Sequence, residues 1–392
     1  MRKIFQLLTS RIVLAVCLLL SLSAVVILAA ILQHAKKTAK PIVINQQLLD
    51  RKINEAPPAW MRERIQRDLA PFSEQGISHQ MIDDLFQGDR IGKYSLIRFT
   101  IKNRRLSFSL EEKQLDSRHF RHLLAALKKL NERVELPDVD FVLSLEDGFD
   151  CNPNGFPISP CFVFAKSERV ANFVLMPDFK ALNGYGKLRQ QILAANAQFP
   201  WKRKTTQAFW RGSTTSGFFE KDNWDRFCRG KLVLASLRSP KEIDARFTGV
   251  VQCTPDVPGL MKAKGMLSKP VEKADHLHYK YLIDVDGNSC TYERCFWLLL
   301  SNSLVLKQVT PNIQWYYGGL KPYVHFLPLK EDLSDLLEQI QWAKIHDEEA
   351  EAIAKRATEF VQENLSAESI FQYMALLLTE YAKLQNFSGD RS

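Results

Sequence analysis

Three groups of polar residues in this chain have the types and spacing needed for chemistry. The first group is the acidic run Glu146, Asp147 and Asp150, which directly follows an apolar segment at residues 139–145. A carboxylate that leaves a strand at the edge of a cleft is well placed to take a proton from a hydroxyl group. The same pattern would also arise from solvated acids in a surface loop, and this alternative stays open.

The second group is a polar turn within residues 284–294, between an apolar segment and an apolar run. Gly287 permits a tight turn, and Asn288 and Ser289 are of the types that occur at helix N-termini. Backbone N–H groups at a helix start, with Arg294 one turn later, would suit a diphosphate. An ordinary capped helix with a surface arginine would give the same spacing.

The third group lies in residues 200–217, where a basic segment leads into Arg211, Gly212, Ser213 and further hydroxyl residues. Arginine can bind phosphate through two parallel hydrogen bonds, and small residues let the backbone approach a ligand. Taken alone, this segment is a Ser/Thr-rich loop, and such loops are more often structural than functional.

Metal and nucleotide motifs receive little support. Asp284 and Asp286 form an Asp-x-Asp pair, which can hold a divalent metal, and His276 and His278 form a His-x-His pair. The first pattern often occurs by chance, and the second lacks a third ligand. The P-loop pattern and the GxGxxG pattern are absent from the sequence, which argues against a P-loop nucleotidase and a nicotinamide enzyme.

The composition is that of a globular protein of about two domains: 392 residues, 46% hydrophobic and 25% charged. Collagen, disordered tails and polytopic transporters are thereby excluded. The net charge is +9, but residues 1–60 hold eight Lys/Arg and only two acids. Because most of the excess surrounds an apolar segment, the charge indicates a membrane partner and not a nucleic acid.

Residues 12–32 are an uncharged apolar run, long enough for a helix to cross a hydrocarbon core of about 30 Å. A short tail, 1–11, precedes this run, and a basic tether, 33–60, follows it. A cleaved signal peptide would have a shorter apolar region and a small-residue cleavage site, so an uncleaved anchor is favoured. Positive charge on both flanks leaves the orientation unset, although a short tail would most simply stay in the cytoplasm.

The rest of the chain predicts an α/β fold, with parallel sheets covered by helices on both faces. We expect helices at 60–69 and 116–133, a hairpin at 95–110, and three helices after an Asp335/Glu338 capping box. The predicted strands are 139–145, 162–165, 173–176, 232–235, 281–285, 304–306 and 324–327.

Cysteine usage leaves two interpretations open. Cys151 and Cys161 bracket a Pro/Gly-rich loop of a kind that disulfides often close. Scattered buried thiols would fit the sequence equally well. The absence of any Cys-x-x-Cys pair argues against a zinc site.

Together, these segments resemble glycosyltransferase family 90 over about residues 135–385, and the chain looks like its bacterial lipopolysaccharide-modifying branch. The blocks that carry the resemblance are 138–147, 199–216, 278–294, 303–307, 320–326 and 332–335. The resemblance implies a GT-B-like fold, in which two Rossmann-like domains face a cleft. On this basis we expect an acceptor domain at 61–200, a UDP-sugar domain at 201–345, and C-terminal helices at 346–392 that pack back across both.

The resemblance also implies an inverting mechanism, a UDP-sugar donor and no metal or other cofactor. By the same resemblance, Asp147 is the general base and Arg294 contacts the donor diphosphate. The full set of expected donor-binding residues is Arg211, Gly212, Ser213, Gly287, Asn288, Ser289 and Arg294. One departure is Glu293, which places a negative charge beside this site where animal members have an aromatic residue.

The expected protein is therefore a single-pass glycosyltransferase of a bacterial inner membrane. It would move a hexose or pentose from a UDP-sugar to a hydroxyl of a surface glycan or lipopolysaccharide. A catalytically inactive glycan-binding or scaffold protein is the alternative, and retention of Asp147, Arg211 and Arg294 together favours the enzyme. The sequence does not determine the sugar, the acceptor, the side of the membrane or the oligomeric state.

Overall fold

The computed structural model describes residues 44–149 and 156–386. The predicted tail 1–11 and membrane segment 12–32 lie outside these ranges, as do Cys151 and the candidate acid Asp150. Within the described ranges, no helix combines the length and the apolar character that a membrane span requires. Cys161 is a free, buried thiol in these ranges.

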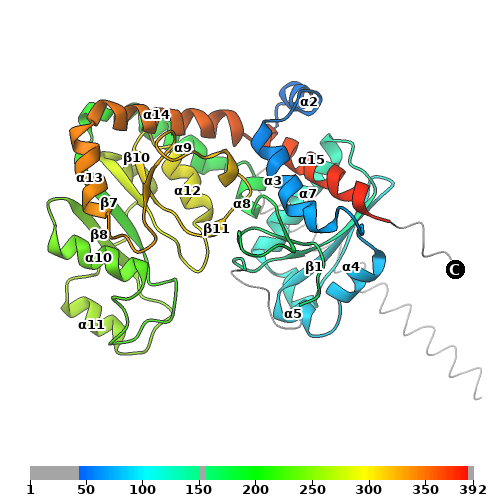
Figure 1. The fold of residues 1–392 in the computed structure, drawn as a ribbon, viewed down its shortest axis with the longest axis horizontal. Coiled ribbons are helices and arrows are strands. Elements are labelled where there is room, and N and C mark those ends of the chain that lie inside the picture. Colours follow the sequence, from blue (N-terminus) through cyan, green and yellow to red (C-terminus); the bar gives the residue numbers. More distant parts are fainter. Residues whose placement is uncertain (1–43, 150–155, 387–392) are drawn as a thin grey trace, which may run out of the picture.

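Two five-stranded sheets form the framework of the molecule (Figure 1). The first sheet has the order β2-β1-β3-β4-β6, with β1 Leu96–Lys102, β2 Arg105–Ser109, β3 Val139–Ser144, β4 Cys161–Val163 and β6 Phe173–Leu175. The second has the order β12-β10-β9-β7-β8, with β7 Thr205–Ser213, β8 Ile243–Gly249, β9 Tyr279–Asp284, β10 Leu304–Gln308 and β12 Leu327–Leu329. We call the elements packed around each sheet the first and the second half. A short antiparallel pair, β5 Lys166–Ser167 with β11 Asn312–Ile313, joins the halves.

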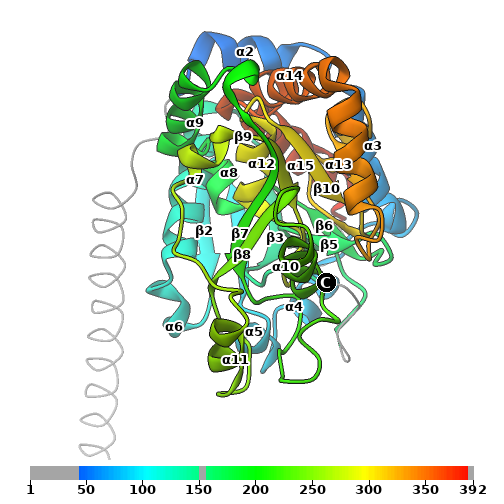
Figure 2. The same cartoon turned by 90° about the vertical axis from the view of Figure 1, so that its left-hand side faces the viewer.

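Helices cover both sheets (Figure 2). Those that precede β7 are α2 Gln46–Asn54, α3 Ala59–Leu69, η1 Ala70–Phe72, α4 His79–Leu85, α5 Arg90–Lys93, α6 Glu112–Leu115, α7 Arg118–Arg133, α8 Phe179–Leu182, α9 Gly186–Gln198 and η2 Trp201–Arg203. Those that follow β7 are α10 Cys228–Arg238, α11 Val257–Ala263, η3 Lys273–His278, α12 Tyr292–Leu299, η4 Tyr317–Gly319, α13 Leu336–Ile345, α14 Asp347–Asn364 and α15 Ala367–Leu384. The α/β class predicted from the sequence is confirmed.

The strand order of the second sheet creates a place for a ligand. All its pairs are parallel, and β7 lies between β8 and β9, so the order of the strands reverses between β7 and β9. Loops leave the carboxyl ends of these two strands in opposite directions and open a crevice, where ligands of open α/β sheets bind. The first sheet is mixed, because the predicted hairpin β1–β2 is present and pairs antiparallel to β3.

Some predicted elements differ in the structure. Residues 232–235, predicted as a strand, lie inside α10, since a four-residue apolar run does not distinguish a buried strand from a buried helix. The expected Ser/Thr-rich loop is largely strand β7, the second strand from one edge of its sheet. The helix after Asp335 is confirmed, but the Asp335 carboxylate accepts a hydrogen bond from the Lys330 N–H and does not cap it. Residues 46–54 of the predicted tether form α2, which packs on α15 through buried Leu49.

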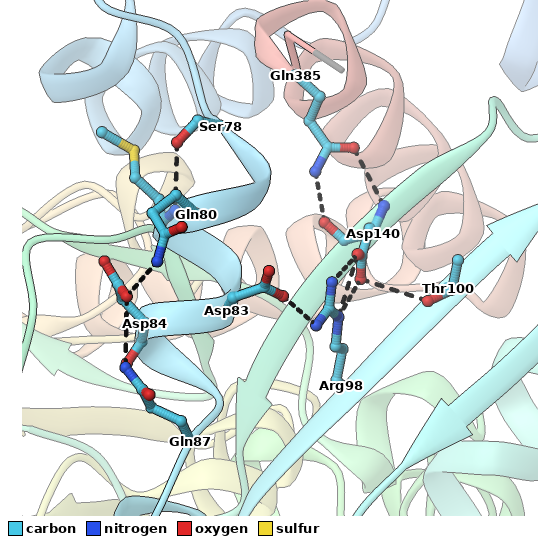
Figure 3. Close-up of polar contacts among 10 residues, drawn as sticks. Ser78, Gln80, Asp83, Asp84, Gln87, Arg98, Thr100, Asp140 and Gln385 are labelled. Carbon is cyan, nitrogen blue, oxygen red and sulfur yellow. Dashed lines mark hydrogen bonds and ion pairs between the residues drawn. The ribbon is translucent and has the colours of Figure 1, made fainter. Parts of the chain in front are cut away.

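The last helices run from one half to the other (Figure 1). Helix α14 contacts α12 and β10 in the second half, whereas α15 contacts α3, α8 and β3 in the first. The end of α15 is fixed to the first sheet (Figure 3): the Gln385 side-chain amide donates to the Asp140 carbonyl and accepts from the Asp140 N–H.

A charged link lies beneath this contact. The buried Asp140 carboxylate of β3 accepts hydrogen bonds of 2.6–3.1 Å from Nε and Nη2 of Arg98 on β1. On its other side, Arg98 donates to exposed Asp83 of α4 at 2.6 Å. The hydrogen bond with Asp140 raises the pKa of Arg98 above its ordinary value. The pair therefore joins the sheet, α4 and the C-terminal helix.

We expect Arg98→Met to destabilise the protein by about 3 kcal/mol, because it leaves the Asp140 carboxylate buried without its cation. Urea unfolding of the full chain measures this change in free energy. The matched control is Asp83→Asn, which removes only the exposed partner of Arg98 and should cost less than about 1 kcal/mol. Equal effects of the two substitutions would contradict this assignment.

Candidate functional site

A crevice of about 900 Å³ opens at the carboxyl ends of β7, β9 and β10. We call it the switch-point crevice, and its lining includes Ser216, Gly217, Gly287, Asn288, Thr310 and Ser167. Ser167 comes from the first half and the other five from the second, so the crevice lies where the two halves meet.

Arg229 of α10 is buried between the carboxyl ends of β7 and β9. Its Nη1 donates to the Ser213 carbonyl at 2.9 Å, and its Nε donates to the Asp286 carbonyl at 2.8 Å. Burial, followed by the repulsion of Arg294, lowers the pKa of Arg229 to about 10. Its hydrogen-bond partners in the described chain are carbonyl oxygens, so the guanidinium holds the two strand ends together without being neutralised.

Arg294 lies in the first turn of α12 and brings a second cation to this place. Its Nη2 donates to the Arg211 carbonyl at 2.8 Å. The guanidinium groups of Arg294 and Arg229 lie 5.9 and 5.7 Å from the Trp210 ring centroid. Burial lowers the pKa of Arg294, while Asp284 and Glu293 offset part of that effect. Two neighbouring cations bonded to neutral oxygens give a positive field that suits an anion.

The glycines of this region allow close packing. A Cβ on Gly212 would lie 2.4 Å from the Trp210 ring, and a Cβ on Gly287 would lie 2.9 Å from Nη2 of Arg229. Ser213 contributes its carbonyl to Arg229, and the Asn288 side chain accepts from the Ser216 N–H at 3.3 Å.

The Arg211 guanidinium binds other groups of the protein in this structure. Its Nη2 forms an ion pair with Asp244 of β8 at 2.8 Å, and its Nη1 donates to the carbonyls of Trp210 and Asp244. The guanidinium also lies over the Phe209 ring, 4.2 Å from its centroid. Its predicted contact with phosphate therefore stays a prediction, whereas its backbone carbonyl positions Arg294.

The Asp147 loop meets α12 directly. Asp147 is exposed, three residues after β3, and its carbonyl accepts a hydrogen bond from the Tyr292 hydroxyl in the first turn of α12. Gly148 has φ +128°, and a Cβ there would lie 2.8 Å from the Ala165 carbonyl oxygen and 2.9 Å from Ser289 Oγ. The loop that carries the predicted base is therefore packed against the helix that carries Arg294.

The acids of the Asp-x-Asp pair have partners within the protein. Asp284 accepts a hydrogen bond from the Thr291 hydroxyl and lies 3.6 Å from Nζ of Lys307. The Asp286 carboxylate accepts from Thr310 at 2.6 Å and from Asn312 at 3.1 Å. Among the described residues, no group of three His, Cys, Asp or Glu side chains could share a metal ion. These carboxylates hold the loops of the crevice together.

Glu293, the departure noted in the sequence, turns away from the crevice. It pairs with Lys273 of η3 and, at 3.4 Å, with Lys180 of α8. Although burial opposes the change, these two lysines lower the pKa of Glu293. The carboxylate thus links the two halves.

Sequence reasoning missed Arg229 and Tyr292. Arg229 had a signal, since it is a charged residue shortly before the apolar run 232–235, but that run was predicted as a strand. Tyr292 had none, because its partner Asp147 is 145 residues away along the chain.

Comparison with known proteins gives a consistent result. The model of the family described as "Glycosyl transferase family 90" matches residues 54–392, which confirms the predicted family and extends it beyond residue 135 toward the N-terminus. "Protein O-glucosyltransferase 2" of Danio rerio is 32% identical over 338 residues, covering 82% of this chain. The chain spans only 62% of that relative's length. "Protein O-glucosyltransferase 1" of Rattus norvegicus is 30% identical over 350 residues, covering 83% of this chain and 81% of the relative.

We expect Gly148→Ala to cost about 3 kcal/mol, because it adds a steric clash with the Ala165 carbonyl to an unfavourable backbone conformation. The matched control is Gly186→Ala, since Gly186 also has a positive φ, +45°, but a Cβ there would meet no atom within 4 Å. The control should lose about 1 kcal/mol. Urea unfolding of both full-length variants measures the difference, and equal losses would show that the contact with Ala165 and Ser289 does not matter.

Proposed function

The chain belongs to glycosyl transferase family 90, and we propose that it transfers a hexose or pentose from a UDP-sugar to a glycan hydroxyl with inversion. Family membership supports glycosyl transfer. The names of the relatives, which describe O-glucosyl transfer, make UDP-glucose the first donor to test. We further propose a GT-B-like arrangement, supported by a doubly wound second sheet and a crevice that both halves line.

One observation carries the proposal. The guanidinium groups of Arg229 and Arg294 lie near the switch point and donate hydrogen bonds to carbonyl oxygens. The Asp147 loop packs on α12, the helix that carries Arg294. A donor diphosphate bound here would lie between these cations and the N-terminus of α12, which carries a partial positive charge. Gly287, Asn288 and the segment 211–213 would complete the donor site.

In the proposed reaction, Asp147 takes the proton of the acceptor hydroxyl as its oxygen attacks the anomeric carbon. The attack comes from the face opposite UDP, and the bond between the anomeric carbon and the diphosphate oxygen breaks. The electron pair leaves with UDP, where Arg229, Arg294 and the helix N–H groups stabilise the charge. We propose that this set of cations serves without a metal ion.

The cellular setting is proposed from the sequence. Residues 12–32 would form a single membrane anchor, and the enzyme would work at a bacterial inner membrane. A surface glycan or lipopolysaccharide is the proposed acceptor, since anchoring would hold the active site near such molecules.

We expect Asp147→Asn to lower sugar transfer by about 10²- to 10⁴-fold, because an amide does not accept the acceptor proton. UDP affinity should remain nearly unchanged. The matched control, Glu146→Gln, should leave transfer unchanged, since Glu146 turns toward Ser95 and accepts a hydrogen bond from its hydroxyl at 2.8 Å. Transfer by the full chain is measured as UDP released from a panel of UDP-sugars with and without acceptor.

Full activity of Asp147→Asn would refute this role of Asp147. A wild-type chain that binds UDP, yet releases none from any UDP-sugar, would instead favour the catalytically inactive alternative.

We expect Arg294→Met to weaken UDP binding by about 10- to 100-fold, because it removes charge-assisted hydrogen bonds to the diphosphate. Arg238→Met, at the far end of α10, removes an exposed arginine and should leave binding unchanged. Isothermal titration with UDP measures both variants. Unchanged affinity in Arg294→Met would move the diphosphate away from α12.

A further inference from the structure

A second group of basic residues lies close to Asp147, on elements that do not line the switch-point crevice. We call it the basic cluster, and its residues are Arg118, His119, Arg121, His122 and Lys180. The first four occupy the first two turns of α7 in the order Arg-His-x-Arg-His. The spacing of three and four residues places them next to one another on the helix surface.

Packing fixes this cluster to the rest of the site. The His119 ring stacks on Phe179, with centroids 4.1 Å apart, and Phe179 directly precedes Lys180 in α8. The Asn183 amide donates to the His122 carbonyl at 3.3 Å. Lys180 reaches Glu293 of α12, next to Tyr292, which holds the Asp147 loop. The cluster therefore borders Asp147 from the first half, while α12 borders it from the second.

Arg118 and Arg121 have no ion-pair partner among the described residues, whereas Lys180 is paired with Glu293. Among the described groups that act most strongly on the His119 and His122 imidazoles, Arg118, Arg121 and Lys180 are cations and Asp147 is the single anion. Burial, and then these cations, lower the pKa of both histidines. The buried Nε of Arg121 has no hydrogen-bond partner in the described chain. Such a surface attracts anions.

From this juxtaposition we infer that the acceptor carries an anionic group, a phosphate or a carboxylate, near its reacting hydroxyl. The basic cluster binds that group while Asp147 faces the hydroxyl. The inference rests on the proposed function, because it takes the neighbourhood of Asp147 as the acceptor site. It adds a substrate class that the family membership does not supply.

The test uses the full chain with saturating UDP, so that the proposed donor site is occupied. Binding of glucose 6-phosphate, glucuronic acid and glucose is measured by isothermal titration. We expect both anionic sugars to bind at least about tenfold more tightly than glucose, and the preference to fall as salt is added. The variant Arg118→Gln/Arg121→Gln should lose most of this preference. The matched control, Lys129→Gln/Arg133→Gln, removes the same charge farther along α7 and should keep it.

Equal binding of the three sugars, or an unchanged preference in Arg118→Gln/Arg121→Gln, would overturn the inference. A preference for only one of the two anions would support it and identify the group. UDP titration of the wild type and of the same variants separates the two proposals. A wild type that does not bind UDP would count against the proposed donor site. An anion preference that depends on the basic cluster would still support the inference.

Discussion

The site depends on a buried guanidinium placed between two parallel strands. Because β7 has neighbours on both sides, the loops after β7 and β9 diverge, and their carbonyls would face an open gap. Arg229 fills that gap by donating to the carbonyls of Ser213 and Asp286. A buried cation is costly unless its N–H groups are satisfied, and carbonyl oxygens satisfy them without cancelling its charge. The same contact thus joins the strand ends and places a positive charge directly behind Gly287, which lines the crevice.

The second requirement is that the two halves keep a fixed position relative to each other, since the proposed base belongs to the first half and the arginines belong to the second. Gly148 lets the Asp147 loop approach Ser289 closely, and the Tyr292 hydroxyl fixes that loop to α12. Glu293, one residue later, pairs with Lys180 across the boundary. The strand pair β5–β11 and the passage from α14 to α15 add further links. Each contact acts over a short distance, and together they orient one half against the other.

The fold class, the hairpin and the C-terminal helices could be predicted from the sequence because periodicity and turn residues are local. Asp147 and Arg294 were singled out for the same reason, as each follows a recognisable strand or turn. The partners of these residues could not be predicted. Arg211 binds Asp244 on β8, and the alternation of apolar and polar residues in β8 does not indicate which strand it pairs with. Arg229 lies beside an apolar run that suits either helix or strand. Contacts between distant segments depend on how elements pack, which local spacing does not encode.

The arrangement also explains why a negative residue is tolerated next to Arg294. The Glu293 carboxylate turns to Lys180 and Lys273, so its charge is neutralised on the outer side of α12. Arg294 points the other way, to the Arg211 carbonyl. One helical turn therefore directs a cation toward the end of β7 and an anion toward the lysines. Asp147 lies at the boundary between these two regions and remains exposed, so in the proposed reaction the proton that it accepts would pass to water.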